Sequence, residues 1–209
     1  MTSPAVYLIG GGDHGRVLLE ALLLQGVPVA GILDPGLAIG DHIFGVAVCS
    51  DAVILNVPRH LTRLVNGVGG RNDNTRRNEI YGRYLEQGFQ FAGVTHPSVV
   101  IGRDCTIHES AQFLANVVIQ QRVEIGENSV VNTSSVVEHD SRVGANCFLG
   151  PRVTLSGRVE ICDSAFVGAG AVVLPGIRVG AAARVGAGAV VTRDVEPNRT
   201  VVGNPARAL

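Results

Sequence analysis

Large aromatic side chains are scarce in this sequence. Its 209 residues include no Trp and one Met, and only 4% are aromatic, whereas Gly occurs 27 times. A core with so few large rings must be built from Val, Ile, Leu and Ala, which favours a repetitive architecture with thin layers. The length allows one large domain or two small ones and is sufficient to bury a real core.

Three other absences limit the partners and the compartment. No long basic run accompanies the net charge of −1, which argues against nucleic acid or an anionic membrane as a partner. Met1 is followed by Thr-Ser-Pro and a short apolar run that ends in glycines, so we expect neither a signal peptide nor a membrane span. The four cysteines form no C-x-x-C pair, which is typical of a reducing, cytoplasmic compartment rather than of disulfides or a zinc site.

A period of six dominates the second half of the chain. An unbroken six-residue period is the pattern of neither an amphipathic helix nor a half-buried strand. It is the hexapeptide signature of a parallel β-helix, in which each repeat supplies one short strand and one corner. The repeating positions, all aliphatic or Phe, are Ile101, Ile107, Phe113, Ile119, Ile125, Val131, Val137, Val143, Leu149, Leu155, Ile161, Val167, Val173, Val179, Val185 and Val191.

Three strands complete one coil of such a fold, so residues eighteen apart are expected to stack. The corners need a sharply turned backbone, and we expect glycine to supply it, with Asn132 as another residue that tolerates it. The glycines that directly follow a repeating position are Gly102, Gly126, Gly144, Gly150, Gly168, Gly180 and Gly186.

The pattern is different before residue 95. An apolar strand at 5–9 leads into a run of glycines, a helix that ends at Gly26 and a second strand at 27–33. This strand–helix–strand unit is typical of a small parallel α/β domain, about half of a Rossmann fold. Further along we expect a strand at 61–65, a helix within 70–88 and a last strand at 88–94. The predicted domains are therefore 1–95, which is α/β, 96–195, which is an all-β β-helix, and a tail at 196–209 that leaves the repeat after Val191.

The glycines after the first strand match G-x-G-x-x-G. Gly10, Gly12 and Gly15 open the first helix, and Asp34 ends the second strand, nineteen residues after Gly15. This is the arrangement in which phosphates reach a helix N-terminus and an acid holds a ribose. Fewer than a hundred residues supply only one mononucleotide-binding half, so a nucleotide-sugar fits better than NAD. The alternative is a tight strand–helix turn that needs glycine for packing alone.

The run VVNTSSVVEHD at 130–140 ends in three titratable groups. Val137 is a repeating position, so Glu138, His139 and Asp140 are expected on an outer edge of the β-helix. A histidine at neutral pH can accept a proton, and a neighbouring carboxylate can fix its tautomer and raise its basicity. The alternative is a solvated histidine on a polar edge.

A zinc site like that of the γ-type carbonic anhydrases is a further alternative. The β-helix contains His96, His108 and His139, which are twelve and thirty-one residues apart. These spacings do not place the three rings on one face, as three ligands at about 2 Å from one metal would require. We therefore expect no metal.

Seven segments, taken in order, resemble the sialic-acid O-acetyltransferase-like branch of the left-handed β-helix acyltransferases. They are GGGDHGR, ILDP, THPSVVIG, NTSSVVEHD, VVLPGIRVG, VGAGAVVTRDV and GNPAR. The likeness covers nearly the whole chain and is strongest to the bacterial nucleotide-sugar N-acetyltransferases, such as the PglD-type and perosamine enzymes. It implies a left-handed prism, a homotrimer with sites between adjacent subunits, acetyl-CoA as donor, and cytoplasmic work in glycan or polysaccharide precursor synthesis.

The resemblance also implies roles for individual residues. His139 matches the general base, and Asp140 matches the acid that raises its basicity. Phe148 stands where the family often has a second histidine near the acetyl group, and Pro35 stands where a second acid often follows Asp34. The positions that match nucleotide-sugar contacts are Gly12, Asp13, His14, Asp34, Asn66 and Gly67, and those that match contacts with CoA are Phe148, Ala169, Ala187 and Arg207.

The predicted activity is acetyl transfer to the amino group of a nucleotide-linked 4-amino-4,6-dideoxy sugar. No cysteine nucleophile is required, so we expect direct transfer. Two other interpretations are O-acetylation of a sugar and a non-catalytic scaffold that binds nucleotide-sugars.

Overall fold

The computed structural model describes residues 4–70 and 73–209. They form two compact units. The chain runs from the first unit into the second, returns to the first and then ends in the second. The first, here called the α/β unit, contains the described residues up to Gly69 together with Thr75–Pro97. The second, here called the prism, contains Gly70, Asp73 and Asn74 together with Ser98–Leu209.

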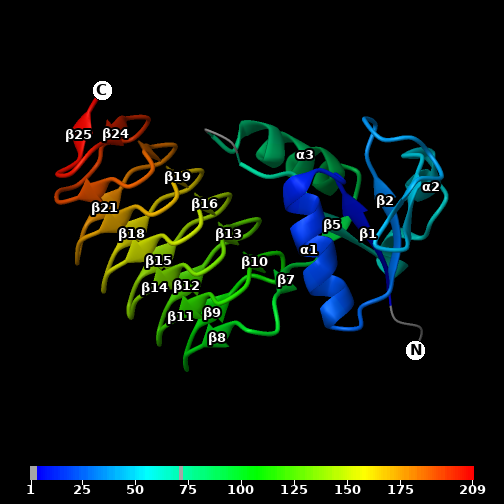
Figure 1. Ribbon diagram of the computed structural model, residues 1–209, viewed down its shortest axis with the longest axis horizontal. Coiled ribbons are helices and arrows are strands. Elements are labelled where there is room, and N and C mark those ends of the chain that lie inside the picture. The colour runs from blue at the N-terminus through cyan, green and yellow to red at the C-terminus, as the bar shows by residue number, and fades with distance from the viewer. Residues whose placement is uncertain (1–3, 71–72) are drawn as a thin grey trace. The chain divides into compact units, whose positions relative to one another are not determined.

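The α/β unit is built on a six-stranded sheet with the order β3-β4-β2-β1-β5-β6 (Figure 1). β1 pairs in parallel with both β2 and β5, so the strand order reverses at β1. Ligands of open α/β sheets bind at such a switch point, beyond the carboxyl ends of the strands. The strands are β1 (Ala5–Ile9), β2 (Val29–Leu33), β3 (His42–Ile43), β4 (Val46–Cys49), β5 (Thr62–Asn66) and β6 (Gln90–Phe91), and β7 (Val94–Thr95) ends the unit.

The helices of this unit pack an apolar face on the sheet. Leu18, Leu19 and Leu22 of α1 are buried, whereas Glu20 on the opposite side of the helix is exposed, as the helical period requires. The helices are α1 (Asp13–Leu24), α2 (Ala52–Leu55), the 3₁₀ helix η1 (Arg59–Leu61) and α3 (Thr75–Glu86). No helix in the described ranges is both long and apolar enough to cross a membrane.

The sequence predicted the first strand, the first helix and the helix after residue 70, but it did not predict the elements between Asp34 and Leu61. There the structure has a tight hairpin, β3–β4, and the short helix α2. Phe44 and Gly45 turn the hairpin with φ of 49° and 82°. Two-residue hairpin turns of this kind favour Asn-Gly or Asp-Gly, so Phe44 gave no turn signal.

The prism is a parallel β-helix of two-residue strands, three to a coil (Figure 1). Partners in neighbouring coils are eighteen residues apart, as in the pairing of Val118 with Val136. Face 1 contains β10 (Gln112–Phe113), β13 (Val130–Val131), β16 (Phe148–Leu149), β19 (Phe166–Val167), β22 (Arg184–Val185), β24 (Thr200–Val202) and β25 (Arg207–Ala208). Face 2 contains β8 (Val100–Ile101), β11 (Val118–Ile119), β14 (Val136–Val137), β17 (Thr154–Leu155), β20 (Val172–Val173) and β23 (Val190–Val191). Face 3 contains β9 (Thr106–Ile107), β12 (Glu124–Ile125), β15 (Arg142–Val143), β18 (Glu160–Ile161) and β21 (Arg178–Val179).

The predicted period of six identifies the interior. Every repeating residue from Phe113 to Val191 is buried, whereas Ile101 in the first coil is 42% exposed. Each fully buried Val, Ile or Leu side chain contributes about 1.5–3 kcal/mol relative to exposure, so the stack provides its own core. The period ends at Val191, but the stacking continues, because Val195 bridges to Val179 and Val201 pairs with Val185 at a spacing of sixteen.

The prediction that the glycines directly after repeating positions turn the corners was wrong. The left-handed backbone lies three residues after most repeating positions, for example at Asp104, with φ of 59°, and glycine supplies it at Gly170, Gly176 and Gly188. Gly126 and Gly168, directly after repeating positions, have no positive φ, and a Cβ added to either would lie 2.6 Å or 2.5 Å from backbone atoms of the next coil. These glycines therefore permit close stacking and do not turn the chain. Asn132 has no positive φ either, and its Oδ1 accepts a hydrogen bond from the Thr133 amide at 2.7 Å.

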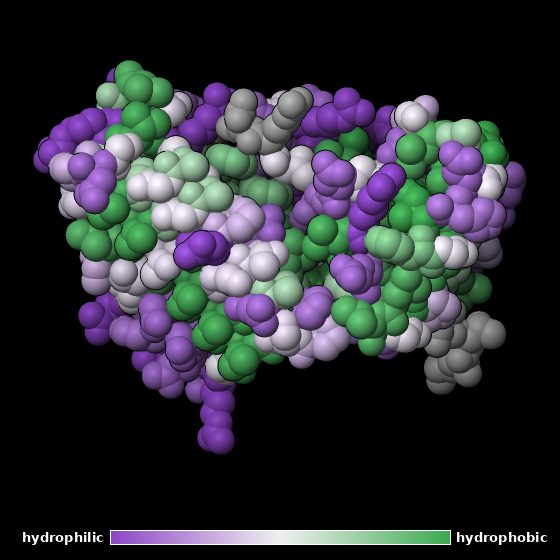
Figure 2. Space-filling view, viewed as in Figure 1, coloured by the Kyte–Doolittle hydropathy of each residue, from purple (hydrophilic) through white to green (hydrophobic). Residues whose placement is uncertain are grey.

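The outward residues differ from face to face. The outward positions of face 2 are Val100, Val118, Val136, Thr154, Val172 and Val190, and all are half-buried or exposed. Figure 2 shows hydrophobic residues at the surface of the coils, among hydrophilic ones. On face 3 the outward charges alternate, and Glu160 pairs with Arg178 at 2.7 Å. The outward column of face 2 is thus mostly apolar, while that of face 3 is charged.

Candidate functional site

His139 and Asp140 lie on the corner that follows β14. The Nδ1 atom of His139 is 2.7 Å from Oδ2 of Asp140. Asp140 has a left-handed backbone with φ of 59°, a conformation that Asp tolerates better than most residues. The His139 side chain is 42% exposed, so the ring is held at one nitrogen and is partly open to solvent.

This contact determines which ring nitrogen can act as a base. An ionised carboxylate can only accept hydrogen bonds, so Nδ1 of His139 donates to Asp140 and carries the ring proton. The neutral ring then presents an unprotonated Nε2. A base held by an orienting acid is an arrangement typical of general-base catalysis.

Arg122 is a member of this cluster that the sequence interpretation missed. Its Nε donates to Oδ1 of Asp140 at 2.6 Å and its Nη2 to Oδ2 at 3.1 Å. Hydrogen bonds from Arg122 and then from His139 hold the pKa of Asp140 well below its usual range. The sequence feature that could have revealed this contact is the spacing of eighteen residues between Arg122 and Asp140. That spacing places the two residues at the same corner of neighbouring coils.

Gly157 is a second residue that sequence reasoning missed. It stands eighteen residues after His139, and a Cβ added to it would lie 2.8 Å from both Cε1 and Nε2 of the His139 ring. Gly157 has no positive φ, so its backbone does not require glycine. The missing side chain instead leaves the space in which the imidazole lies.

The predicted CoA contacts occupy several surfaces of the prism. Ala169 and Ala187 are exposed and lie one coil apart on a corner, each followed by a glycine with positive φ. Arg207 is exposed in β25, and its Nη1 donates to the carbonyl oxygen of Ala206. Phe148 is 5% exposed and stacks on Phe166, with ring centroids 5.8 Å apart.

Residues of the connection that enters the prism pack beside Phe148. A Cβ added to Gly70 would lie 3.0 Å from Cγ of Phe148. Asn74 is buried, and its Nδ2 donates to the carbonyl oxygens of Asn146 and Ala165 at 3.0 Å and 3.1 Å. Phe148 is therefore buried against Phe166 and close to Gly70, and its phenyl ring offers no hydrogen-bond donor, as a polarising histidine would.

In the α/β unit, the glycine turns meet at the switch point beside β1. The Gly67 amide donates to the carbonyl oxygen of Ile9 at 2.7 Å. A Cβ added to Gly15 would lie 2.0 Å from the carbonyl oxygen of Gly10, and one added to Gly67 would lie 2.6 Å from the same atom. Packing thus explains Gly15, as the alternative interpretation of the G-x-G-x-x-G motif proposed, and it also explains Gly67.

Gly12 has no such packing reason. It is exposed, its φ is −71°, and no heavy atom lies within 4 Å of the position that its Cβ would take. Gly12 is the N-cap of α1 and has no side chain to cap the helix. The amides of the first helical turn lack acceptors within the helix, which makes such a terminus suitable for an anion.

Asp13 and His14 lie in this first turn of α1. Asp13 is exposed and His14 is half-buried. Cβ of His14 is 3.0 Å from the position that a Cβ on Gly69 would take. The helix is capped by Gly12, so His14 is not its cap, and the ring lies beside the loop that follows β5.

The other predicted residues of this unit organise its loops. Asp34 accepts from the amides of Gly11 at 2.7 Å and Gly36 at 2.8 Å. Asn66 is buried, and its Nδ2 donates to the carbonyl oxygen of Arg77 at 3.1 Å. Arg77 in turn donates to the carbonyl oxygens of Asn66 and Val68, and desolvation by burial lowers its pKa to about 9.

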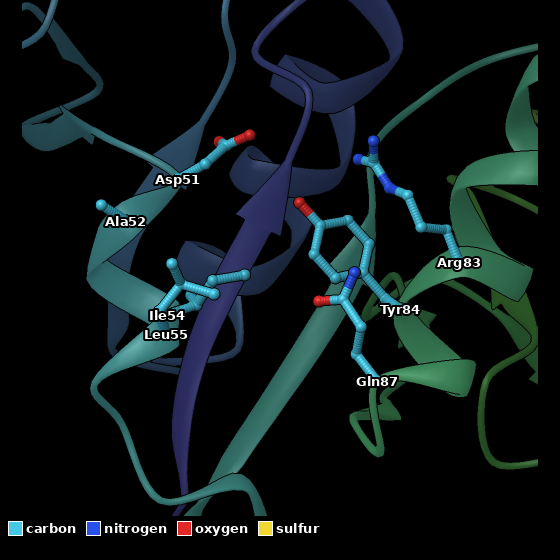
Figure 3. A pocket seen from close by; sticks show the side chains of 7 residues that line it. All are labelled: Asp51, Ala52, Ile54, Leu55, Arg83, Tyr84 and Gln87. Carbon is cyan, nitrogen blue, oxygen red and sulfur yellow. The ribbon is translucent and has the colours of Figure 1, made fainter.

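A separate pocket of about 260 Å³ lies between α2 and α3 (Figure 3). The guanidinium of Arg83 lies over the ring of Tyr84, 4.9 Å from its centroid, and burial raises the pKa of the Tyr84 hydroxyl. None of the site residues predicted from the sequence lines this pocket, which is formed by Asp51, Ala52, Ile54, Leu55, Arg83, Tyr84 and Gln87.

Metal-ligating side chains do not gather at the predicted site. Within residues 4–70 and 73–209, the structure contains no group of three or more His, Cys, Asp or Glu side chains placed to hold a metal ion.

Comparison with known proteins identifies the class. The sequence profile of the bacterial transferase hexapeptide family (six repeats) matches residues 98–133, 122–157 and 158–193. The fold is therefore that of a hexapeptide-repeat transferase, a left-handed β-helix preceded by a short α/β region, as predicted.

Solved structures extend the match to the whole chain. The perosamine N-acetyltransferase of Caulobacter crescentus, in complex with CoA and GDP-perosamine, is 36% identical with a TM-score of 0.89, over 100% of this chain and 98% of that one. The acetyltransferase domain of PglB from Neisseria gonorrhoeae, in complex with acetyl coenzyme A, is 27% identical with a TM-score of 0.90, over 100% of both chains. WeeI from Acinetobacter baumannii is 25% identical with a TM-score of 0.88, over 99% of this chain and 100% of that one. The chain belongs to the family of hexapeptide-repeat acetyltransferases that includes the Caulobacter enzyme.

Proposed function

We propose that this protein transfers the acetyl group of acetyl-CoA to the amino group of a nucleotide-linked amino sugar of the 4-amino-4,6-dideoxy type. The observation that carries the proposal is the His139 ring, whose Nδ1 is held by Asp140 at 2.7 Å while the side chain remains 42% exposed. The relative that binds CoA and GDP-perosamine matches this chain over its full length, which supports the same donor and the same class of acceptor.

The transfer requires one proton to be removed from the attacking amine. The amine nitrogen forms a bond to the thioester carbonyl carbon, and Nε2 of His139 takes the proton that this nitrogen loses. The carbon–sulfur bond then breaks, and the CoA thiolate leaves and can take the proton from the imidazolium. Such base help is typically worth ~10²–10⁴-fold in rate.

The nucleotide-sugar is assigned to the switch point of the α/β unit. Gly12 has open space around it, and the first turn of α1 that follows it offers amides to a diphosphate. Asp13 and His14 belong to that turn, and Asp34 fixes the loop after β2 through two amide contacts. We assign Asn66 and Gly67 the supporting role of shaping the loop after β5.

The acetyl-CoA arm is assigned to the corner that carries Ala169 and Ala187. Both residues are exposed and their side chains are single methyl groups, so an extended thiol-bearing arm could approach the backbone closely there. Arg207 offers a cation to a CoA phosphate. Phe148 supplies no donor to the thioester carbonyl, so a backbone amide or water is required to stabilise the oxyanion.

We propose a homotrimer whose sites lie between adjacent subunits. The support is the family resemblance together with face 2, whose outward column of five Val residues and Thr154 is half-buried or exposed beside the corner that bears His139. Exposed apolar surface of this kind marks an interface in many proteins.

We place the enzyme in the cytoplasm, because four free cysteines fit a reducing compartment. The family resemblance supports a role in glycan or polysaccharide precursor synthesis.

A panel of nucleotide-linked amino sugars, beginning with GDP-perosamine, tests the activity. The purified protein is mixed with acetyl-CoA and each acceptor, and free thiol release is followed alongside the product mass. We expect thiol release with at least one acceptor and a product that resists mild hydroxylamine, as an amide does and an ester does not. A hydroxylamine-sensitive product would establish O-acetylation instead. If thiol release stays at the acceptor-free rate with every acceptor in the panel, the protein is a non-catalytic scaffold.

A further inference from the structure

The corner that bears Asp140 carries a column of alternating charges. Asp104, Arg122, Asp140 and Arg158 are each eighteen residues apart, and their φ values are 59°, 57°, 59° and 62°. The prism therefore presents an acid and a cation in turn at the same corner of four successive coils.

Asp140 uses only one of its two cationic neighbours in this column. Arg122 contacts both carboxylate oxygens, at 2.6 Å and 3.1 Å. The only ion pairs of Asp140 within the described residues are those with Arg122 and His139, so Arg158, one coil further on, does not hold it. The two arginines share a backbone conformation and differ in this contact.

The Arg122 contact constrains the carboxylate that faces His139. Oδ2 of Asp140 accepts from both Nη2 of Arg122 and Nδ1 of His139. Two parallel bonds from a guanidinium fix the plane of a carboxylate as well as its position. Without them Asp140 could rotate about its side-chain bonds, and Nδ1 of His139 would lose a fixed acceptor.

We propose that Arg122 is a positioning residue for the acetyl transfer, acting through Asp140 to keep the Nε2 lone pair of His139 directed at the acceptor. The inference rests on the proposed function. Arg122 itself touches neither substrate nor the ring in this scheme, and its influence passes through one carboxylate.

A double-mutant cycle tests whether the influence passes through Asp140. We expect Arg122→Gln to lower kcat roughly 10-fold, less than the loss of the base itself, with KM for both substrates within about twofold. Arg122→Lys should recover part of the loss, because it restores a cation without the bidentate geometry. In Asp140→Asn the further change Arg122→Gln should have no additional effect, since residues that act as one unit are non-additive.

Arg158→Gln is the matched control. It removes an arginine from the same corner and the same backbone conformation, so it reproduces any strain or general charge effect, and its kcat should stay within about twofold of the wild type. Unchanged kcat in Arg122→Gln, an equal loss in Arg158→Gln, or losses that multiply in the double mutant would each overturn the inference. Failure of the proposed function is distinguishable, because the wild-type protein would then release no thiol in the same assay.

Discussion

Replacement of Gly157 by alanine tests the orientation of the His139 ring directly. The added Cβ would lie 2.8 Å from Cε1 and Nε2 of the ring, whereas heavy atoms in contact normally lie about 3.5–4.0 Å apart. The ring must therefore move by about 1 Å. Because it ends a side chain that is 42% exposed, it can move at little cost to folding.

The expected effect falls on the rate rather than on stability. A misplacement of about 1 Å can cost ~10²-fold in a reaction that depends on orientation, so kcat in Gly157→Ala should fall by about that factor. KM for acetyl-CoA and for the acceptor should change little, and the Tm should stay within about 2 °C. Steady-state thiol release and dye-based thermal melting measure the two quantities.

Gly82→Ala serves as the control for this experiment. Gly82 lies in α3 with no heavy atom within 4 Å of its missing Cβ, so alanine there should leave the rate unchanged and stabilise the helix by up to about 1 kcal/mol. If Gly157→Ala keeps more than half of the wild-type kcat, the ring orientation described here is not the one that the reaction uses. A large fall in Tm would refute the argument that the ring can move with little loss of folding stability.

Four further predictions concern the base, the acid that orients it, the nucleotide and the assembly. His139→Ala should lose ~10²–10⁴-fold in kcat with substrate binding retained, and turnover above half of the wild type would assign the base elsewhere. Asp140→Asn should lower kcat by less than His139→Ala does, because the base remains while its ring loses the carboxylate that orients it, and an unchanged kcat would contradict the pairing. Gly12→Val should abolish nucleotide-sugar binding in calorimetry while acetyl-CoA still binds, since only the α/β unit is altered, and unchanged affinity would show that the open space at Gly12 has no ligand. Light scattering should give about 65 kDa for three chains of 21.8 kDa, and a monodisperse monomer at micromolar concentration would rule out the intersubunit site.

The sequence predicted the interior of the prism because its period is simple. A residue that faces inward recurs every six positions, and the fully buried examples from Phe113 to Val191 follow that count. The pairing of His139 with Asp140 could be anticipated for the same reason, since the residues after Val137 must leave the interior.

The residues around that pair could not be read from a linear pattern. Arg122 and Gly157 lie seventeen residues before and eighteen residues after His139 in the sequence, and their relevance depends on vertical stacking between coils. The role of the glycines after repeating positions was misjudged because sequence alone does not separate a glycine needed for a left-handed φ from one needed for close approach.

Short elements with weak patterns also escaped prediction. The hairpin β3–β4 turns through Phe44, a residue that rarely adopts a positive φ. The grouping of Gly70, Asp73 and Asn74 with the prism depends on contacts such as that between Asn74 and the Ala165 carbonyl, which join residues far apart in the chain.

The spacing of eighteen restricts how proteins with this architecture can change length. An insertion of six residues would move every later strand to the neighbouring face, so that the charged column of face 3 would continue with the Val residues of face 2. An insertion of eighteen adds a whole coil and leaves each face and corner in its original column, because every partner remains one coil away. Evolution or engineering can therefore lengthen this prism in whole coils, above or below the corner of His139, while shorter insertions must bulge out of the stack.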